Sequence, residues 1–244
     1  MLKKATLLAL TASATLMAPS SMAALMTYSQ DFEALDMSNP AALGADGWKV
    51  FANVFDGGGG FLYGYGPFDA PNGSGGFSNV AAGQGGPDQG AQQLVTFSDY
   101  NNGDHGVGNL IEANVFQEQI IGSGDLGSEW TFSFDAKMGD LAGGSTAIAF
   151  IKTLDPNNGF ALTNFVTLDM TNIASTWSTF AMSLFIDPAL DGQILQFGFA
   201  SVATNFEASG VFYDNVDFRP VPLPGAVWLM ISGLAAFTGM RRKG

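Results

Sequence analysis

Hydrophobic and polar residues alternate along most of the chain between Tyr28 and Phe218. The clearest run covers residues 129–138, where an apolar side chain stands at every second position from Trp130 to Met138. Successive side chains of a strand point to opposite faces, so this run predicts a strand with one buried and one polar face. Similar runs predict strands at 30–35, 48–55, 93–97, 110–120, 147–153, 165–170, 176–185, 194–201 and 210–218.

Turn-forming residues separate these runs. Residues 155–159 read Asp-Pro-Asn-Asn-Gly, and Asp-Pro and Asp-Gly pairs stand at 187–188 and 191–192. No amphipathic helix of useful length is evident. Many short strands with this punctuation predict an all-β domain, an antiparallel β-sandwich of the jelly-roll kind, over residues 24–219.

Residues 56–90 depart from the strand pattern. Glycine dominates this segment, which also holds three prolines and five aromatic residues. A stretch of this length with so little alternation is typical of a functional or mobile loop. We therefore expect a long glycine-rich loop region here.

Composition and charge narrow the possible functions. The chain is 47% hydrophobic and 13% charged, which is typical of an ordered globular protein. Five of the nine basic residues lie in the two terminal segments, and the remaining four share the middle with all 22 acidic residues, a net charge of −18. A field of this sign repels nucleic acid and anionic lipid, so nucleic-acid binding is excluded. The acidity indicates either solubility alone or calcium binding.

The metal-binding residue types are scarce. The chain has no cysteine and one histidine, His105, which excludes most zinc, copper, haem and iron–sulfur chemistry. His105 lies in a glycine-flanked turn without a nucleophile motif nearby, so we expect it to be solvated and the protein to be no enzyme. Two carboxylates suffice for a glycosidase, but no acidic pair stands out.

The N-terminus has the three parts of a secretory signal peptide. Lys3 and Lys4 precede an apolar run at 5–17, and Ser21 and Ala23 form a small-x-small cleavage site. Residues 1–23 are thus expected to engage the export machinery and signal peptidase, leaving Ala24 as the first mature residue. An uncut signal anchor is the alternative, although the apolar run is short for one.

The C-terminus, residues 220–244, holds a proline motif, an apolar stretch and a basic cluster. The motif is Val221, Pro222, Leu223 and Pro224, the stretch covers 225–240, and the cluster contains Arg241, Arg242 and Lys243. Sixteen residues of helix span roughly 24 Å, marginal against a hydrocarbon core of ~30 Å. Basic residues favour the cytoplasmic side, so a plain tail anchor with the domain exported is one interpretation.

Residues 221–244 closely resemble the VPLPA variant of the PEP-CTERM sorting signal, with Gly225 where that family usually has alanine. The resemblance implies recognition by an exosortase, which cleaves near the proline motif. It also implies that the membrane is contacted only before processing. The mature protein would then reach the envelope surface or extracellular matrix of a Gram-negative bacterium that makes exopolysaccharide.

The middle domain loosely resembles carbohydrate-binding-module jelly rolls. The similar residues are Asp31-Phe32-Glu33 near its start and Tyr213-Asp214-Asn215-Val216 near its end. The resemblance implies that the first and last strands are neighbours and that carboxylates there hold a structural calcium ion. Asp31 and Glu33 would share one face of a strand, and Asp214 would complete a set of oxygen ligands that suits Ca²⁺. Solvated side chains near strand ends are the alternative.

Sugar binding needs exposed aromatic rings beside amides or carboxylates. The candidates are Trp48, Tyr63 and Tyr65. The two tyrosines have an alternative role, in which they pin the glycine-rich segment onto the sandwich. We expect an exported, exosortase-sorted, non-enzymatic protein that binds or organises exopolysaccharide. The alternatives are a structural matrix protein that binds other proteins and a glycan-active hydrolase or lyase.

Overall fold

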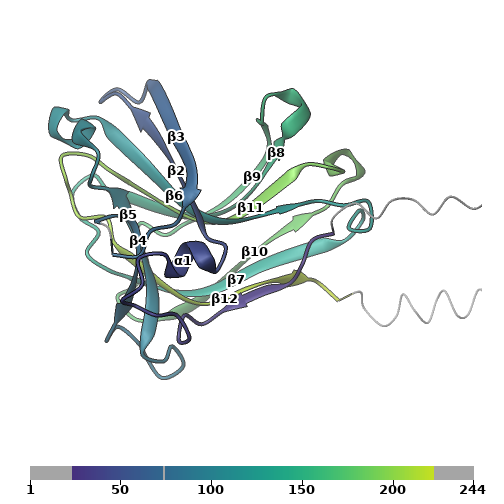
Figure 1. Cartoon of the computed structure of the whole chain (residues 1–244), viewed down its shortest axis with the longest axis horizontal. Coiled ribbons are helices and arrows are strands. Elements are labelled where there is room, and N and C mark those ends of the chain that lie inside the picture. The colour runs from purple at the N-terminus through teal and green to yellow at the C-terminus, as the bar shows by residue number, and fades with distance from the viewer. Residues whose placement is uncertain (1–23, 74, 223–244) are drawn as a thin grey trace, which may run out of the picture.

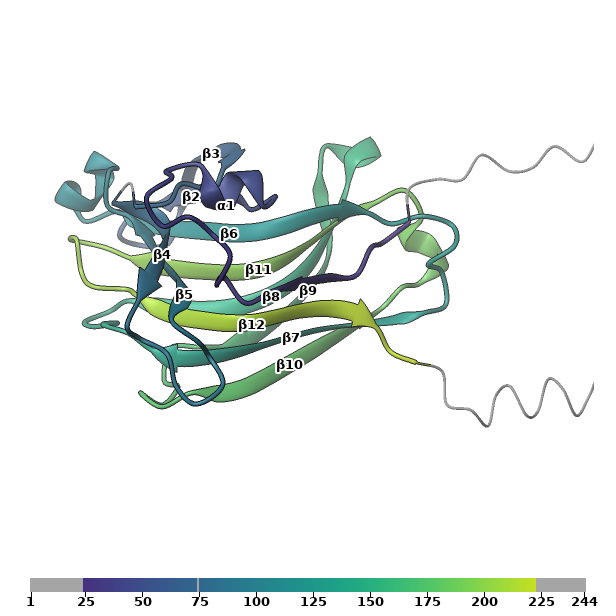
Figure 2. The ribbon, with the colours of Figure 1, turned by 60° about the horizontal axis from the view of Figure 1, so that its bottom comes forward.

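Two antiparallel sheets pack face to face in the computed structural model, which describes residues 24–73 and 75–222 (Figures 1 and 2). This confirms the predicted all-β sandwich. The predicted signal peptide and most of the C-terminal sorting signal lie outside the described residues. Among the residues that are described, no helix has the length and apolar character needed to cross a membrane.

Sheet A has β12 near its centre. Its order is β10 (Ser178–Phe185), β7 (Glu129–Met138), β12 (Val211–Pro220), β5 (Gln92–Asp99) and β4 (Gly76–Ala82). The short strand β1 (Tyr28–Gln30) also pairs with β12, antiparallel, from Tyr28 opposite Phe218. The first and last strands of the described fold are therefore neighbours.

Sheet B has β6 and β11 at its centre. Its order is β3 (Phe61–Asp69), β2 (Lys49–Phe55), β6 (Leu110–Ile120), β11 (Ile194–Ala203), β8 (Thr146–Asp155) and β9 (Ala161–Asp169). Figure 1 shows β2 and β3 rising on one side and β8 and β9 on the other, so that the outer face of sheet B is concave. Helical segments are short: α1 (Ala42–Ala45), η1 (Gly103–Val107), η2 (Pro156–Asn158) and η3 (Pro188–Leu190).

Aromatic side chains fill the space between the sheets. The alternation in β7 places Trp130, Phe132 and Phe134 in this core, as predicted. Phe199 of β11 stacks on Tyr213 of β12 with ring centroids 3.6 Å apart, which joins the two sheets. Apolar burial of this extent is the main favourable contribution to folding.

The prediction of a long loop at 56–90 is wrong, because this segment contains the two strands β3 and β4. The strand β3 lacks the alternating pattern in the sequence because glycines stand where it packs closely against β2. A Cβ atom on Gly64 would approach Phe51 Cζ to 2.8 Å, and one on Gly66 would approach Phe51 Cα to 3.1 Å. The Phe51 ring thus takes the place of side chains that would otherwise mark a strand.

The prediction of a strand at 30–35 is wrong except for Gln30, because the observed strand β1 covers Tyr28–Gln30. β1 ends at Gln30, and Phe32 has a left-handed φ of 59° while its side chain is fully buried. The chain turns at this point so that the Phe32 ring reaches the core. Asp31 and Glu33 therefore lie beyond β1 and do not share a strand face.

Candidate functional site

A second apolar cluster lies on the outer, concave face of sheet B. It contains Phe116, Phe150 and Ala200, with Phe51 and Ile148 packed against them, and we call these five residues the aromatic floor. Their neighbours along the strands, such as Val115, Ala149 and Phe199, belong instead to the core between the sheets. Outward-facing rings are normally exposed, yet Phe116 and Phe150 are 1% and 0% exposed. The outer face of sheet B therefore carries a small packed apolar cluster of its own.

Gly198 makes this packing possible. It lies opposite Phe116 on one neighbouring strand and opposite Phe150 on the other. A Cβ atom here would come within 2.7 Å of Phe116 Cα and still closer to the Val115 carbonyl oxygen. Without a side chain at this central position, the two flanking rings can cover the strand between them.

Lys152 of β8 extends over the aromatic floor. Its Nζ lies 4.7 Å from the centre of the Phe150 ring and 5.5 Å from that of Phe116. Burial lowers the pKa of Lys152 to about 8, although the carboxylates of Glu112 and Glu118 act in the opposite direction. Within the described part of the chain, its ammonium group has neither a salt bridge nor a hydrogen-bond acceptor.

Amide and carboxylate groups flank the floor at both ends. Glu112 Oε1 accepts hydrogen bonds from Asn53 Nδ2 at 2.8 Å and from Asn114 Nδ2 at 2.9 Å. At the other end, Glu118 Oε2 accepts one from Gln196 Nε2 at 2.5 Å. The second oxygen of each carboxylate has no hydrogen bond to another described residue.

A row of side chains crosses four strands at the Glu118 end. Glu118, Gln196, Lys152 and Phe165 lie opposite one another on β6, β11, β8 and β9. Phe165 is 51% exposed, and its ring centre lies 6.2 Å from that of Phe150. The face thus combines ring surfaces, charged donors and free acceptor oxygens, which together suit a ligand rich in hydroxyl groups.

The two acids of β6 are poorly placed for glycoside hydrolysis. Glu112 and Glu118 are six residues apart on one strand, which corresponds to about 20 Å of backbone. Glycosidase carboxylates stand at roughly 5–10 Å from each other across the scissile bond. This pair therefore lacks the separation that glycoside hydrolysis needs.

Trp48 is not available as a sugar platform. Its side chain is fully buried and lies in the core against Phe199, with ring centroids 6.3 Å apart. The prediction of an exposed ring was wrong because Trp48 directly precedes β2 and faces inward with the alternate residues Val50 and Ala52.

Tyr63 and Tyr65 lie side by side on β3, with ring centroids 6.0 Å apart. The Tyr65 hydroxyl donates to Asp99 Oδ2 at 2.6 Å, and that of Tyr63 donates to Asp104 Oδ2. Both hydroxyl groups also accept from Asn102 Nδ2 at 3.2 Å. These bonds tie β3 to the segment around η1, which fits the alternative role considered for the two tyrosines. Tyr63 is 43% exposed, so sugar contact at this rim stays a prediction.

His105 is fully buried and not solvated as expected. Its ring lies between those of Tyr100 and Phe206, at centroid distances of 5.4 and 5.1 Å. Burial lowers the pKa of His105, so the imidazole is neutral. The neighbouring residues Asp104 and Gly106 are polar or small, so the sequence did not indicate that the His105 side chain is buried.

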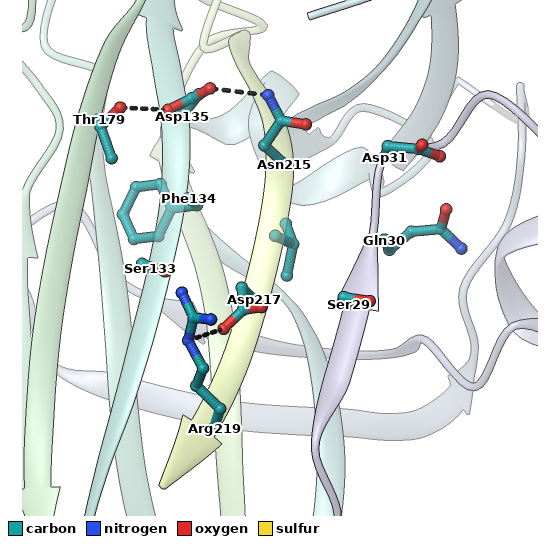
Figure 3. Close-up of a pocket in the computed structure, with 11 residues that line it drawn as sticks. Ser29, Gln30, Asp31, Ser133, Phe134, Asp135, Thr179, Asn215, Asp217 and Arg219 are labelled. Atoms are coloured by element: carbon teal, nitrogen blue, oxygen red, sulfur yellow. Dashed lines mark hydrogen bonds and ion pairs between the residues drawn. The ribbon is translucent and has the colours of Figure 1, made fainter. Parts of the chain in front are cut away.

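The acids predicted to bind calcium lie on the other sheet, around the end of β1 and the middle of β12. A pocket of about 450 Å³ opens beside them on the outer face of sheet A, and Asp31, Asp135 and Asn215 are among its lining residues. In Figure 3, Asp135 lies between Thr179 and Asn215, which donate to it at 2.6 and 2.8 Å. Asp217 pairs with Arg219 at the opposite end of the pocket.

Asp214 is the buried member of this group. Its Oδ1 accepts from Asn215 N at 2.6 Å, whereas its Oδ2 is buried without a hydrogen bond in the described structure. Burial, with a smaller contribution from the negative charges of Glu33, Asp135 and Asp31, raises the pKa of Asp214 to about 7. An unpaired buried oxygen among acids fits a cation ligand.

The rest of the expected ligand set fits less well. Glu33 Oε1 is occupied by the backbone N–H groups of Ala91 and Gln92, both at 2.7 Å. Over residues 24–73 and 75–222, no three His, Asp or Glu side chains converge as a metal site. Calcium binding by Asp31, Glu33 and Asp214 stays a prediction. Such an ion would be held by Asp214 and by backbone carbonyl or side-chain amide oxygens.

The aromatic floor and Lys152 were missed in the sequence. One signal for them exists: in 147–153, Ile148 and Phe150 stand between the inward residues Ala147, Ala149 and Ile151, so both faces of this strand are apolar. A strand of that kind is covered on both sides. In this structure the flanking side chains of Phe51 and Ile148, together with Lys152 above the rings, provide that cover on the outer side.

Comparisons with known proteins give similarity of fold. No family model and no curated protein matches the chain. The enzymatically active domain of tailspike protein 4 of bacteriophage CBA120 is 14% identical, with a TM-score of 0.45 over 77% of this chain and 21% of that chain. The CBM22-1 xylan-binding domain of Paenibacillus barcinonensis Xyn10C is 10% identical, with a TM-score of 0.37 over 60% of this chain and 82% of that domain. A cyclase from Fischerella sp. TAU is 13% identical, with a TM-score of 0.43 over 83% of this chain and 99% of that one.

Proposed function

We propose that this protein is a non-enzymatic polysaccharide-binding protein whose ligand lies along the outer face of sheet B. One observation carries the proposal: a lysine above the aromatic floor has no acceptor among the described residues, and the half-exposed ring of Phe165 lies beside it. Partial desolvation of an ammonium group without a partner is unfavourable. A ligand with many hydroxyl groups would accept hydrogen bonds from the lysine and contact the Phe165 ring.

Phe165→Ala is expected to weaken polysaccharide binding about 3- to 10-fold, because an aromatic contact is worth roughly 0.5–1.5 kcal/mol. The ring is exposed, so its removal should leave the fold intact. Affinity electrophoresis in gels that contain host exopolysaccharide, xylan or β-glucan measures the effect. Phe206→Ala is the matched control, since Phe206 is 53% exposed but lies beside His105, away from sheet B. Equal losses in the two variants would contradict the proposed face.

We further propose that the protein is exported and sorted through its C-terminal signal. The support is the order of proline motif, apolar stretch and basic cluster in residues 221–244. The expected result is that the surface form in the native host lacks these residues, because an exosortase cleaves near Pro222 and Pro224. Mass spectrometry of the mature C-terminus tests this. An intact Arg241 and Arg242 in the surface form would contradict it.

A structural matrix protein that binds other proteins remains the second candidate. Its support is the exposed apolar residues along the edge strand β9 and its preceding turn, which include Phe160 at 60% and Leu162 at 55% exposure. A protein that no polysaccharide retains, but that sediments with other matrix proteins, would favour this role.

A further inference from the structure

We propose that the outer face of sheet B selects neutral glycans and that Glu112 and Glu118 exclude acidic ones, while Lys152 donates hydrogen bonds to ligand hydroxyl groups. This inference rests on the proposed function and names its ligand class. It starts from the charged groups that surround the aromatic floor.

Lys152 is the one cation that faces the floor without an acidic partner in the described structure. Lys49 of β2 lies opposite Phe116 on the same face, but its Nζ is 2.5 Å from Asp69 Oδ1. Arg219 pairs with Asp217 on sheet A. The N–H groups of Lys152 are thus the donors that a ligand above Phe116 and Phe150 would meet first.

The same face carries more negative than positive charge. Glu112 and Glu118 both act on the ammonium group of Lys152 from opposite ends of the floor. Asp169, opposite Ile148 at the end of β9, adds a third carboxylate to this face. Lys49 is matched by Asp69, so Lys152 remains as one positive charge against Glu112, Glu118 and Asp169 on this face, and the middle of the chain carries a net charge of −18. A carboxylate on the ligand would add a further negative charge to this excess, which is unfavourable.

Neutral hydroxyl groups avoid this conflict. A hydroxyl group accepts from Lys152 while it donates to a carboxylate, so one ligand group can serve both kinds of protein partner. Glu112 and Glu118 each accept hydrogen bonds from side-chain amides at one carboxylate oxygen and leave the other oxygen available. The two ends of the floor can therefore bind hydroxyl groups of one chain, with the half-exposed Phe165 ring packed against one of its apolar faces.

The test compares polymers that differ only in charge. The probes are polygalacturonate and its carboxyl-reduced form, glucuronoxylan and unsubstituted xylan, together with neutral β-glucan and mannan. Affinity electrophoresis and titration calorimetry measure binding to the full-length protein. The neutral member of a bound pair should bind at least tenfold more tightly, and added salt should shrink the difference because charge repulsion is screened.

The double variant Glu112→Gln, Glu118→Gln keeps an acceptor oxygen for the amide neighbours and removes both charges. Its preference for the neutral polymer over the acidic one should fall about tenfold compared with that of the natural protein, whatever the change in absolute affinity for the neutral polymer. Asp217→Asn, on the other sheet, is the matched control and should change neither affinity.

Three results separate the possibilities. Equal or tighter binding of the acidic polymer by the natural protein overturns the inference and leaves the proposed function standing. Unchanged discrimination in the double variant also overturns it, because the two glutamates would then not be its cause. If none of the probes binds, the proposed function fails, and the inference fails with it.

Discussion

Lys152→Met is expected to stabilise the fold and to abolish polysaccharide binding at the same time. The pKa of Lys152 falls from 10.5 to about 8 on folding because burial disfavours its charged form. At neutral pH the folded protein therefore holds a charge that the unfolded chain solvates better. Removing that charge should raise the free energy of unfolding by about 2 kcal/mol, a value discounted for partial solvent contact. Methionine has a flexible thioether chain that still packs on the rings of Phe116 and Phe150.

The pH dependence identifies the cause of this gain. Between pH 8 and pH 10.5 the unfolded chain keeps the proton on Lys152 and the folded protein does not, so the natural protein becomes more stable as pH rises. The advantage of the variant should therefore shrink over this range. Urea unfolding at neutral and alkaline pH measures it. Lys49→Met is the matched control, since Lys49 is an exposed partner of Asp69 and should change stability little.

A variant that gains stability and loses a function marks a residue kept for that function. A purely structural Lys152 would give the reverse result, a loss of stability and unchanged binding. Lys152→Met with unaltered affinity for every polysaccharide would remove this residue from the proposed site.

The strand pattern was readable wherever one face is buried and the other solvated. β7 agrees residue for residue with the expected run because period-two alternation directly reflects one-sided burial, and β6 also agrees although both of its faces are largely covered. β3 was missed because glycines stand where neighbouring side chains occupy the space, as Phe51 does at Gly64. β1 was overextended because Phe32 turns inward through a left-handed backbone, which a phenylalanine rarely adopts.

The candidate site was harder to foresee than the fold. Whether a single aromatic ring is exposed depends on which face of the sheet its side chain lies on, and the residue type alone does not give this. Trp48 lies inside for this reason, whereas Phe150 and Phe116 face outward. The position of Lys152 depends on the register of β8 with β11 and on Gly198 between two phenylalanines. Long-range pairing of this kind is not encoded in local periodicity.

Asp214→Asn is expected to stabilise the protein above neutral pH when calcium is absent. Folding raises the pKa of Asp214 from 3.8 to about 7, chiefly through burial and then through Glu33, Asp135 and Asp31. The stabilisation associated with the protonated form is complete below pH 4 and is lost as pH rises towards 7. An asparagine keeps the acceptor for Asn215 N and never ionises. The variant should gain on the order of 2 kcal/mol at pH 8, or several degrees in Tm, and nothing at pH 4.

Calcium should reverse the order of the two proteins if Asp214 is a ligand. A bound cation would favour the ionised carboxylate and raise the Tm of the natural protein, whereas Asp214→Asn would respond little. Melting curves at pH 8 in chelator and in millimolar calcium separate the two effects, with Asp191→Asn as the control at an exposed position away from this pocket. A natural protein whose Tm ignores calcium would show that the predicted site is wrong. A variant less stable than the natural protein in chelator would show that the ionised Asp214 is stabilised by something other than a metal ion. Burial and metal binding therefore make opposite predictions for the same carboxylate, and one substitution distinguishes them.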